Sequence, residues 1–196
     1  MLKTTVKVTG LQNLSDARYC AGMGVEMLGF PFPAIEHAKF LEIKSWLAGV
    51  EIVGEMEGLS IDAIRQNVEL YQPDKVQVSQ SVNLDQVKAL GLPILQKIDI
   101  STANLPAAFA ANAPYVEAFV LTCSDELDYE GLKSSVEIWA AQYPIIIGFD
   151  VEESELISWV DESSVKGIEI KSGEEDRPGF RDFSDLMSIL EQLEID

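Results

Sequence analysis

The chain has 196 residues, 47% of them hydrophobic, and a formal net charge of −19 from 14 basic and 33 acidic residues. This length is enough to bury a sizeable core, and we expect residues 1–196 to form one domain. The acidic balance argues against nucleic acid and anionic membrane surfaces as partners, because both are bound through basic surfaces.

The residues that commonly bind metals or form disulfides are scarce. Cys20 and Cys123 lie far apart in the sequence, and His37 is the only histidine. This pattern predicts neither a disulfide framework nor a metal site, and we expect no cofactor. Sparse cysteines suit a reducing cytosol. The N-terminal segment lacks the apolar stretch of a signal peptide, and no apolar run approaches the roughly 20 residues of a membrane span. We therefore expect a cytoplasmic protein.

Short apolar runs alternate with longer amphipathic stretches along the whole chain. The apolar runs predict strands at residues 6–9, 26–30, 51–56, 75–79, 94–100, 118–122, 144–149 and 167–171. The intervening stretches predict helices at residues 15–23, 37–49, 60–71, 83–90, 106–113, 129–142, 154–160 and 183–193. Strand and helix in regular alternation predict parallel β/α units. Eight such units in this length fit a small, short-looped (β/α)₈ TIM barrel better than an open sheet.

Alternation along the strands separates side chains that face the barrel interior from those that face the helices. The apolar side of each strand should face the helices, as Val6 and Val8 do in the first strand and Ile168 and Ile170 in the last. The opposite side predicts an unusually polar interior. Its members, in chain order, are Lys7, Thr9, Gln77, Ser79, Lys97, Asp99, Thr122, Glu169 and Lys171, with Glu55 and Glu57 placed on the same face.

Buried charges persist only when they are paired, because an unpaired one costs several kcal/mol. Two interpretations of this polar interior therefore stand side by side. It can be the floor of a catalytic or ligand-binding site, or an ion network that only fixes the packing. A site in a barrel of this class should lie at the C-terminal ends of the strands.

The two ends of the chain resemble a known enzyme family. VKVTGLQNLSDARYCAGMGVEMLGFPF at residues 6–32 is similar to the opening of phosphoribosylanthranilate isomerase, the TIM barrel of tryptophan biosynthesis, which reads VKICGL, a capped helix ending in GAD, and LGFIF. GIEIKSGEEDRPGFRDFSDLMSILEQL at residues 167–193 resembles the family's close. VEIVGEM, KVQVS and PIIIGFD stand where the family has VGVF, VVQLHG and ILAGGL. The resemblance thus covers nearly the whole chain and is strongest at its ends.

The resemblance implies an Amadori rearrangement of a phosphoribosyl amine, an intramolecular aldose–ketose isomerisation. The family's general base is the cysteine of KICG, and its general acid is an aspartate at the end of strand six. Here these catalytic positions hold Thr9 and Thr122. A threonine hydroxyl does not ionise near neutral pH and cannot replace a carboxylic acid as a proton donor. The resemblance therefore predicts a divergent member of the family.

The resemblance also places the phosphate-binding residues at Gly148, Asp150, Ser172 and Gly173. Ser172 and Gly173 should open a short helix, whose N-terminus would favour an anion. Asp150 and the acidic residues after Gly173 oppose a phosphate unless basic residues offset them.

Three functions remain open from the sequence. The chain is a divergent barrel without the standard isomerase activity, a non-catalytic paralogue that binds a small ligand or a protein partner, or a faithful N-(5'-phosphoribosyl)anthranilate isomerase. The expected ligand is a small molecule, with a phosphosugar as the candidate that the resemblance implies. The family includes monomers and homodimers, and either state is expected here.

Overall fold

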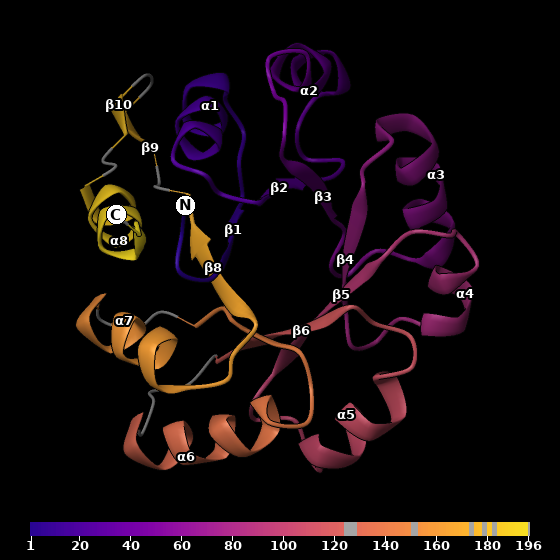
Figure 1. Cartoon of the computed structure of the whole chain (residues 1–196). Helices are drawn as coiled ribbons and strands as arrows, with labels where there is room; N and C mark the ends of the chain where they lie inside the picture. Colours follow the sequence, from indigo (N-terminus) through magenta and orange to yellow (C-terminus); the bar gives the residue numbers. More distant parts are fainter. Residues whose placement is uncertain (124–128, 150–152, 173–174, 178–179, 182–183, 196) are drawn as a thin grey trace.

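A computed structural model of the chain describes residues 1–196 except 124–128, 150–152, 173–174, 178–179, 182–183 and 196. Eight parallel strands form a closed barrel in which β1 (Thr5–Thr9) pairs with both β2 (Met27–Pro31) and β8 (Gly167–Lys171). Helices surround this barrel on the outside (Figure 1). The predicted (β/α)₈ TIM barrel is therefore confirmed.

The remaining strands of the barrel are β3 (Glu51–Glu55), β4 (Lys75–Ser79), β5 (Ile94–Asp99), β6 (Ala118–Thr122) and β7 (Ile145–Ile147). The helices are α1 (Leu14–Gly22), α2 (His37–Lys44), α3 (Ile61–Tyr71), α4 (Leu84–Lys88), α5 (Leu105–Asn112), α6 (Tyr129–Ala140), α7 (Glu153–Glu162) and α8 (Ser184–Leu193). Each predicted strand and helix has a counterpart, although α2 and α4 are shorter than the sequence pattern predicts.

One local prediction was wrong. The segment after Ser172 was expected to begin a short helix, but Glu175–Arg177 form strand β9, which pairs antiparallel with β10 (Phe180–Arg181). Pro178–Gly179, between these two strands, is a sequence pair typical of a turn. The resemblance favoured a helix after Ser172, whereas the structure pairs Glu175–Arg177 as a strand with Phe180–Arg181.

Side-chain oxygens fix the starts of several helices. Asn13 Oδ1 accepts a hydrogen bond of 2.9 Å from the backbone N–H of Asp16 at the start of α1. Ser60 Oγ accepts one of 3.3 Å from Ala63 N at the start of α3. These caps satisfy N–H groups that have no partner within the helix. They help to set where these helices start.

The apolar core lies in two layers. The larger layer fills the space between strands and helices and contains Val6, Val8, Phe119, Leu121 and Ile168 among many others. A smaller cluster fills the barrel itself: Met27, Val53, Leu95, Ala118, Val120 and Ile146. The strands thus present apolar side chains outward, while the interior combines an apolar layer with polar residues.

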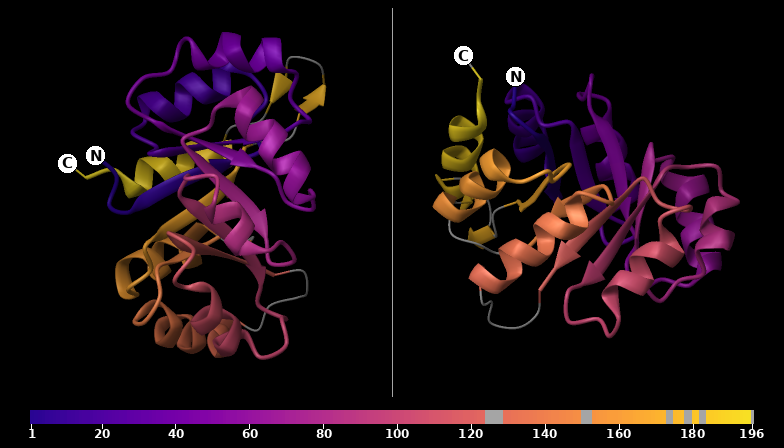
Figure 2. Two further views of the ribbon diagram at one scale, coloured as in Figure 1. Left: turned by 90° about the vertical axis from the view of Figure 1, so that its right-hand side faces the viewer. Right: turned by 60° about the horizontal axis from the view of Figure 1, so that its bottom comes forward.

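The two termini lie side by side beside α8 (Figure 2). Met1 O accepts a hydrogen bond of 2.8 Å from Ile195 N, and Lys3 N donates one of 2.8 Å to Leu193 O. Among the residues described, no helix is both long and apolar enough to cross a membrane.

Candidate functional site at the mouth of the barrel

A buried lysine lies at the centre of the polar interior. Lys7 Nζ, from β1, is 2.6 Å from Glu55 Oε1 at the end of β3 and 2.6 Å from Glu169 Oε2 on β8. The Lys7 side chain is completely buried, and those of Glu55 and Glu169 are almost completely so. A buried ammonium group is tolerated here because two carboxylates contact it directly.

A second lysine extends this network toward the C-terminal ends of the strands. Lys97 Nζ, on β5, is 3.1 Å from Glu169 Oε1 and 3.8 Å from Glu57 Oε1, and its side chain is 30% exposed. Gln77 Nε2, on β4, donates a hydrogen bond of 2.6 Å to the same Oε1 of Glu57. Polar contacts therefore run continuously from buried Lys7 to partly exposed Lys97. They join five side chains from the strands and a sixth, Glu57, which lies just after β3. We call the set Lys7, Glu55, Glu57, Gln77, Lys97 and Glu169 the mouth network.

Thr9 is attached to this network. Its hydroxyl donates a hydrogen bond to Glu55 Oε1, and the backbone N–H of the next residue, Gly10, donates one of 3.0 Å to Glu55 Oε2. The carbonyl oxygen of Thr9 accepts a hydrogen bond of 2.9 Å from Ser172 N. Thr9 therefore lies at the end of β1 with its hydroxyl directed at a carboxylate that already neutralises Lys7.

The electrostatics of the network keep Lys7 and Glu169 charged. Burial lowers the pKa of Lys7, but Glu55 and Glu169 outweigh this and hold it above its ordinary value. Burial raises the pKa of Glu169, but Lys7 and Lys97 outweigh this and hold it below its ordinary value. The Lys7 ammonium and the Glu169 carboxylate therefore persist throughout the neutral pH range.

Two glycines, Gly29 in β2 and Gly148 directly after β7, provide space for these carboxylates. A Cβ at Gly29 would lie 2.1 Å from Glu55 Oε1 and 2.9 Å from Lys7 Nζ, so a side chain there displaces the ion pair. A Cβ at Gly148 would lie 3.3 Å from Glu169 Oε1 and 2.9 Å from Val120 Cγ1. We did not assign Gly29 to the site from the sequence, although a glycine inside a strand often marks such a close approach.

The other predicted site residues lie around the mouth. Thr122 Oγ1 donates a weak hydrogen bond of 3.5 Å to Ile98 O, and Asp99 Oδ1 accepts hydrogen bonds of 2.8 and 2.6 Å from Ser101 N and Oγ. Lys171 is exposed at the end of β8, so it adds charge to the rim rather than to the buried interior.

Of the predicted phosphate-binding residues, Gly148 and Ser172 are described. Gly148 N donates a hydrogen bond of 2.9 Å to Leu121 O, and the Ser172 side chain is half-buried. Asp150 and Gly173 lie outside the described residues. The phosphate-binding role therefore stays a prediction. Within the described ranges, no group of three or more histidine, cysteine or acidic side chains could hold a metal ion.

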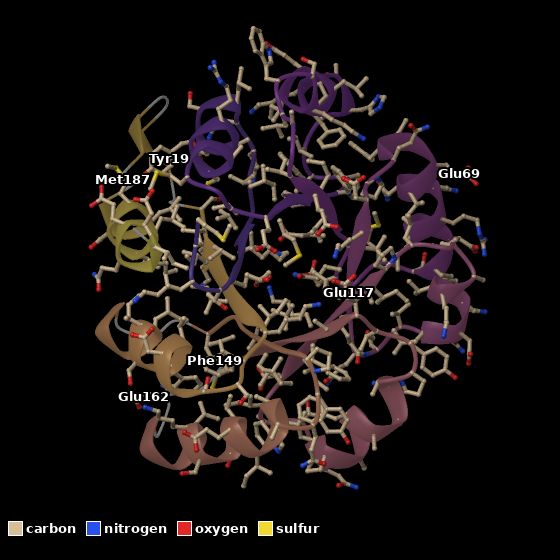
Figure 3. The ribbon with its side chains drawn as sticks, in the orientation of Figure 1. Tyr19, Glu69, Glu117, Phe149, Glu162 and Met187 are labelled. Atoms are coloured by element: carbon tan, nitrogen blue, oxygen red, sulfur yellow. The ribbon has the colours of Figure 1, made fainter. Side chains whose placement is uncertain are left out.

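A second ion cluster lies at the opposite end of the barrel. Lys75 Nζ, at the start of β4, is 2.6 Å from Glu117 Oε1 and 3.0 Å from Glu51 Oε2, and Lys166 Nζ is 3.1 Å from Glu117 Oε1. Figure 3 shows Glu117 close to the ring of strands, whereas Glu162 lies on the outer helix α7. Lys75 lies two residues before Gln77 on β4, so strand alternation could have predicted from the sequence that it also faces inward. This N-terminal face stabilises a barrel rather than binding its ligand.

The closed (β/α)₈ barrel makes this chain a TIM-barrel protein, and its polar side chains at the C-terminal ends of the strands form a candidate site. No protein-family profile matches the sequence, and no curated protein matches it. Similarity appears among solved structures. Phosphoribosyl anthranilate isomerase from Thermotoga maritima has a TM-score of 0.78 and 17% identity, over 97% of this chain and 98% of that one.

The corresponding isomerase from Thermus thermophilus has a TM-score of 0.76 and 18% identity, over 96% of this chain and 98% of that one. 3-Hexulose-6-phosphate synthase from Salmonella typhimurium, a different enzyme, has a TM-score of 0.63 and 11% identity, over 96% of this chain and 98% of that one. At these identities the likeness shows the fold. The resemblance to phosphoribosylanthranilate isomerases is thus confirmed for the architecture of the whole chain.

Proposed function

We propose that the chain is a divergent phosphoribosylanthranilate isomerase-like barrel. It binds a small ligand at the mouth and does not catalyse the standard Amadori isomerisation. One observation carries this proposal: the hydroxyl of Thr9, at the position of the family's general base, donates its proton toward Glu55. A catalytic base must instead accept a proton from the substrate.

The surroundings of Glu55 support the same conclusion. Its two carboxylate oxygens accept from the Thr9 hydroxyl, the Lys7 ammonium and the Gly10 amide, and the residue is almost completely buried. Glu55 is therefore occupied as a structural acceptor and does not substitute for the missing base. Thr122, at the position of the general acid, has no acidic proton to donate.

Ligand binding is supported by the position and exposure of the mouth network. Lys97 and Glu57 are each 30% exposed at the C-terminal ends of the strands. One similar phosphoribosyl anthranilate isomerase was solved in complex with reduced 1-(o-carboxyphenylamino)-1-deoxyribulose 5-phosphate. By analogy we place the ligand of this chain at the same face. We further propose a cytoplasmic protein, a monomer or a homodimer, that binds no nucleic acid.

The restoring double variant Thr9→Cys with Thr122→Asp tests this proposal. It returns both proton-transfer groups to the family's residues and leaves the rest of the mouth unchanged. We expect no isomerase activity, because Asp150 and the acidic residues after Gly173 would still oppose the substrate phosphate. Product formation from N-(5'-phosphoribosyl)anthranilate is the measurement, with the wild-type chain assayed alongside. A double variant with robust turnover would overturn the proposal, because the substrate pocket would then be intact.

A further inference from the structure

Two hydrogen-bond acceptors at the mouth have no donor among the described residues. Both described contacts of Glu57, from the Gln77 amide and the Lys97 ammonium, reach its Oε1. Its Oε2 therefore has no partner among the residues that the structure describes. Gln77 Oε1 is completely buried and also has no hydrogen-bond partner within that part of the chain. An unsatisfied buried acceptor is destabilising, so a donor that reaches it would be stabilising.

The arrangement of these acceptors is fixed. A carboxylate only accepts hydrogen bonds, so Gln77 must present its Nε2 to Glu57, and its Oε1 then points away from that bond. The backbone beside Glu57 is held as well, because Gly58 N donates a hydrogen bond of 3.4 Å to Ser79 Oγ on β4. The two acceptors are therefore positioned in advance by β4 and by the end of β3.

The charge of the mouth network favours a cation. Its two ammonium groups, Lys7 and Lys97, face the three carboxylates Glu55, Glu57 and Glu169, which leaves one negative charge. That charge falls on Glu57, because Lys97 lies 3.8 Å from it but 3.1 Å from Glu169. The net charge of −19 on the whole chain acts in the same direction.

Building on the proposed function, we infer that the small ligand of this mouth carries a primary ammonium group. Glu57 is its ion-pair partner, and Gln77 Oε1 is the second acceptor beside it. A primary ammonium offers three donors, no acceptor and a positive charge, which matches two free acceptors and one surplus negative charge. The Glu57 side chain is only 30% exposed, so the group that reaches it must be slender.

Four small probes separate charge from hydrogen bonding. Ethanolamine carries a primary ammonium, choline carries the same charge without N–H donors, ethylene glycol is neutral, and inorganic phosphate is an anion. The full ¹⁵N-labelled chain is titrated with each probe at constant ionic strength, and the Gln77 side-chain amide signals are followed. We expect a saturable shift with ethanolamine, binding of choline weaker by about tenfold or more, and no shift with the other two.

Two matched variants locate the effect. Glu57→Gln removes the ion-pair partner and should weaken ethanolamine binding about tenfold. Glu51→Gln removes the same charge at the other end of β3, where Glu51 pairs with Lys75, and should leave the affinity unchanged. The proposal is overturned by equal binding of choline, by a shift with phosphate in place of ethanolamine, by no saturable shift, or by equal affinity in Glu57→Gln. None of these outcomes contradicts the proposed function. That proposal is tested separately, and turnover of phosphoribosylanthranilate would overturn it.

Discussion

At the scale of single residues, the mouth network depends on the small size of Gly29 as well as on its charged side chains. Glu55 occupies the space that a Cβ on Gly29 would take, and from there it reaches Lys7, Thr9 and Gly10. A glycine in mid-strand weakens a sheet locally, because it gives up conformational entropy and side-chain packing. Here the glycine leaves room for a buried ion pair that a larger residue would displace.

Gly29→Ala should therefore destabilise the protein strongly. The new methyl displaces the Glu55 carboxylate and leaves Lys7 less compensated, at a cost of about 3 kcal/mol. Urea unfolding followed by circular dichroism measures the difference. Gly22→Ala is the control, because a Cβ there meets nothing within 4 Å and Gly22 is exposed at the end of α1. Equal stability of the two variants would show that the ion pair does not need this space.

The sequence predicted many of the residues of the mouth network but not which of them are in contact. Strand parity placed Lys7, Lys97 and Glu169 on the inward face, and the structure shows them in contact. It could not predict which charges would pair, because contacts across a barrel depend on the stagger of non-neighbouring strands. Parity also put Lys171 inward, although it lies past the enclosed part of the barrel, at the end of β8.

At the scale of elements, closure of the barrel depends on the contact between β1 and β8. These strands pair along five positions, from Thr5 with Gly167 to Thr9 with Lys171. Lys7 and Glu169 are direct partners in this register, so the strand pairing itself brings the two side chains of the ion pair together. The sequence pattern predicted both strands well, because apolar alternation is a local signal. It missed the pairing of β9 with β10, because the family resemblance predicted a helix after Ser172.

Gly167→Ala should weaken the pairing of β1 with β8. A Cβ at position 167 would lie 2.2 Å from the carbonyl oxygen of Thr5, and a backbone atom cannot rotate away as a side-chain end can. We expect a loss of about 3 kcal/mol and faster hydrogen exchange in β1 and β8 than in β4 and β5. Uniform exchange changes across all strands, or none, would contradict a local role for Gly167.

At the scale of the whole molecule, the two ion clusters at opposite ends of the barrel enclose the inner apolar layer. Near one end Lys7 and Lys97 pair with Glu169, and at the other Lys75 and Lys166 pair with Glu117. The charge on the buried groups therefore couples global stability to pH. The signs follow from the direction of each pKa shift.

The pKa of Glu169 is lowered in the folded protein, so its contribution is complete above the ordinary value of 4.5 and is lost as the pH falls below it. The pKa of Lys7 is raised, so its contribution is complete below 10.5 and is lost as the pH rises above it. Glu169→Gln should therefore flatten the acid side of the stability profile in urea unfolding. Glu162→Gln, at an exposed pair with Lys133, should change that profile little. Identical acid slopes in Glu169→Gln and the wild type would contradict this assignment.

Whether the wild-type chain isomerises N-(5'-phosphoribosyl)anthranilate is the question on which the proposed function depends most. The purified chain is incubated with this substrate at high protein concentration and neutral pH, beside the isomerase from Thermotoga maritima as the positive control. Because the resemblance places threonines at the positions of both proton-transfer groups, we predict product formation no faster than in buffer alone. Turnover clearly above that background would contradict the proposal and assign the standard isomerase reaction to this barrel.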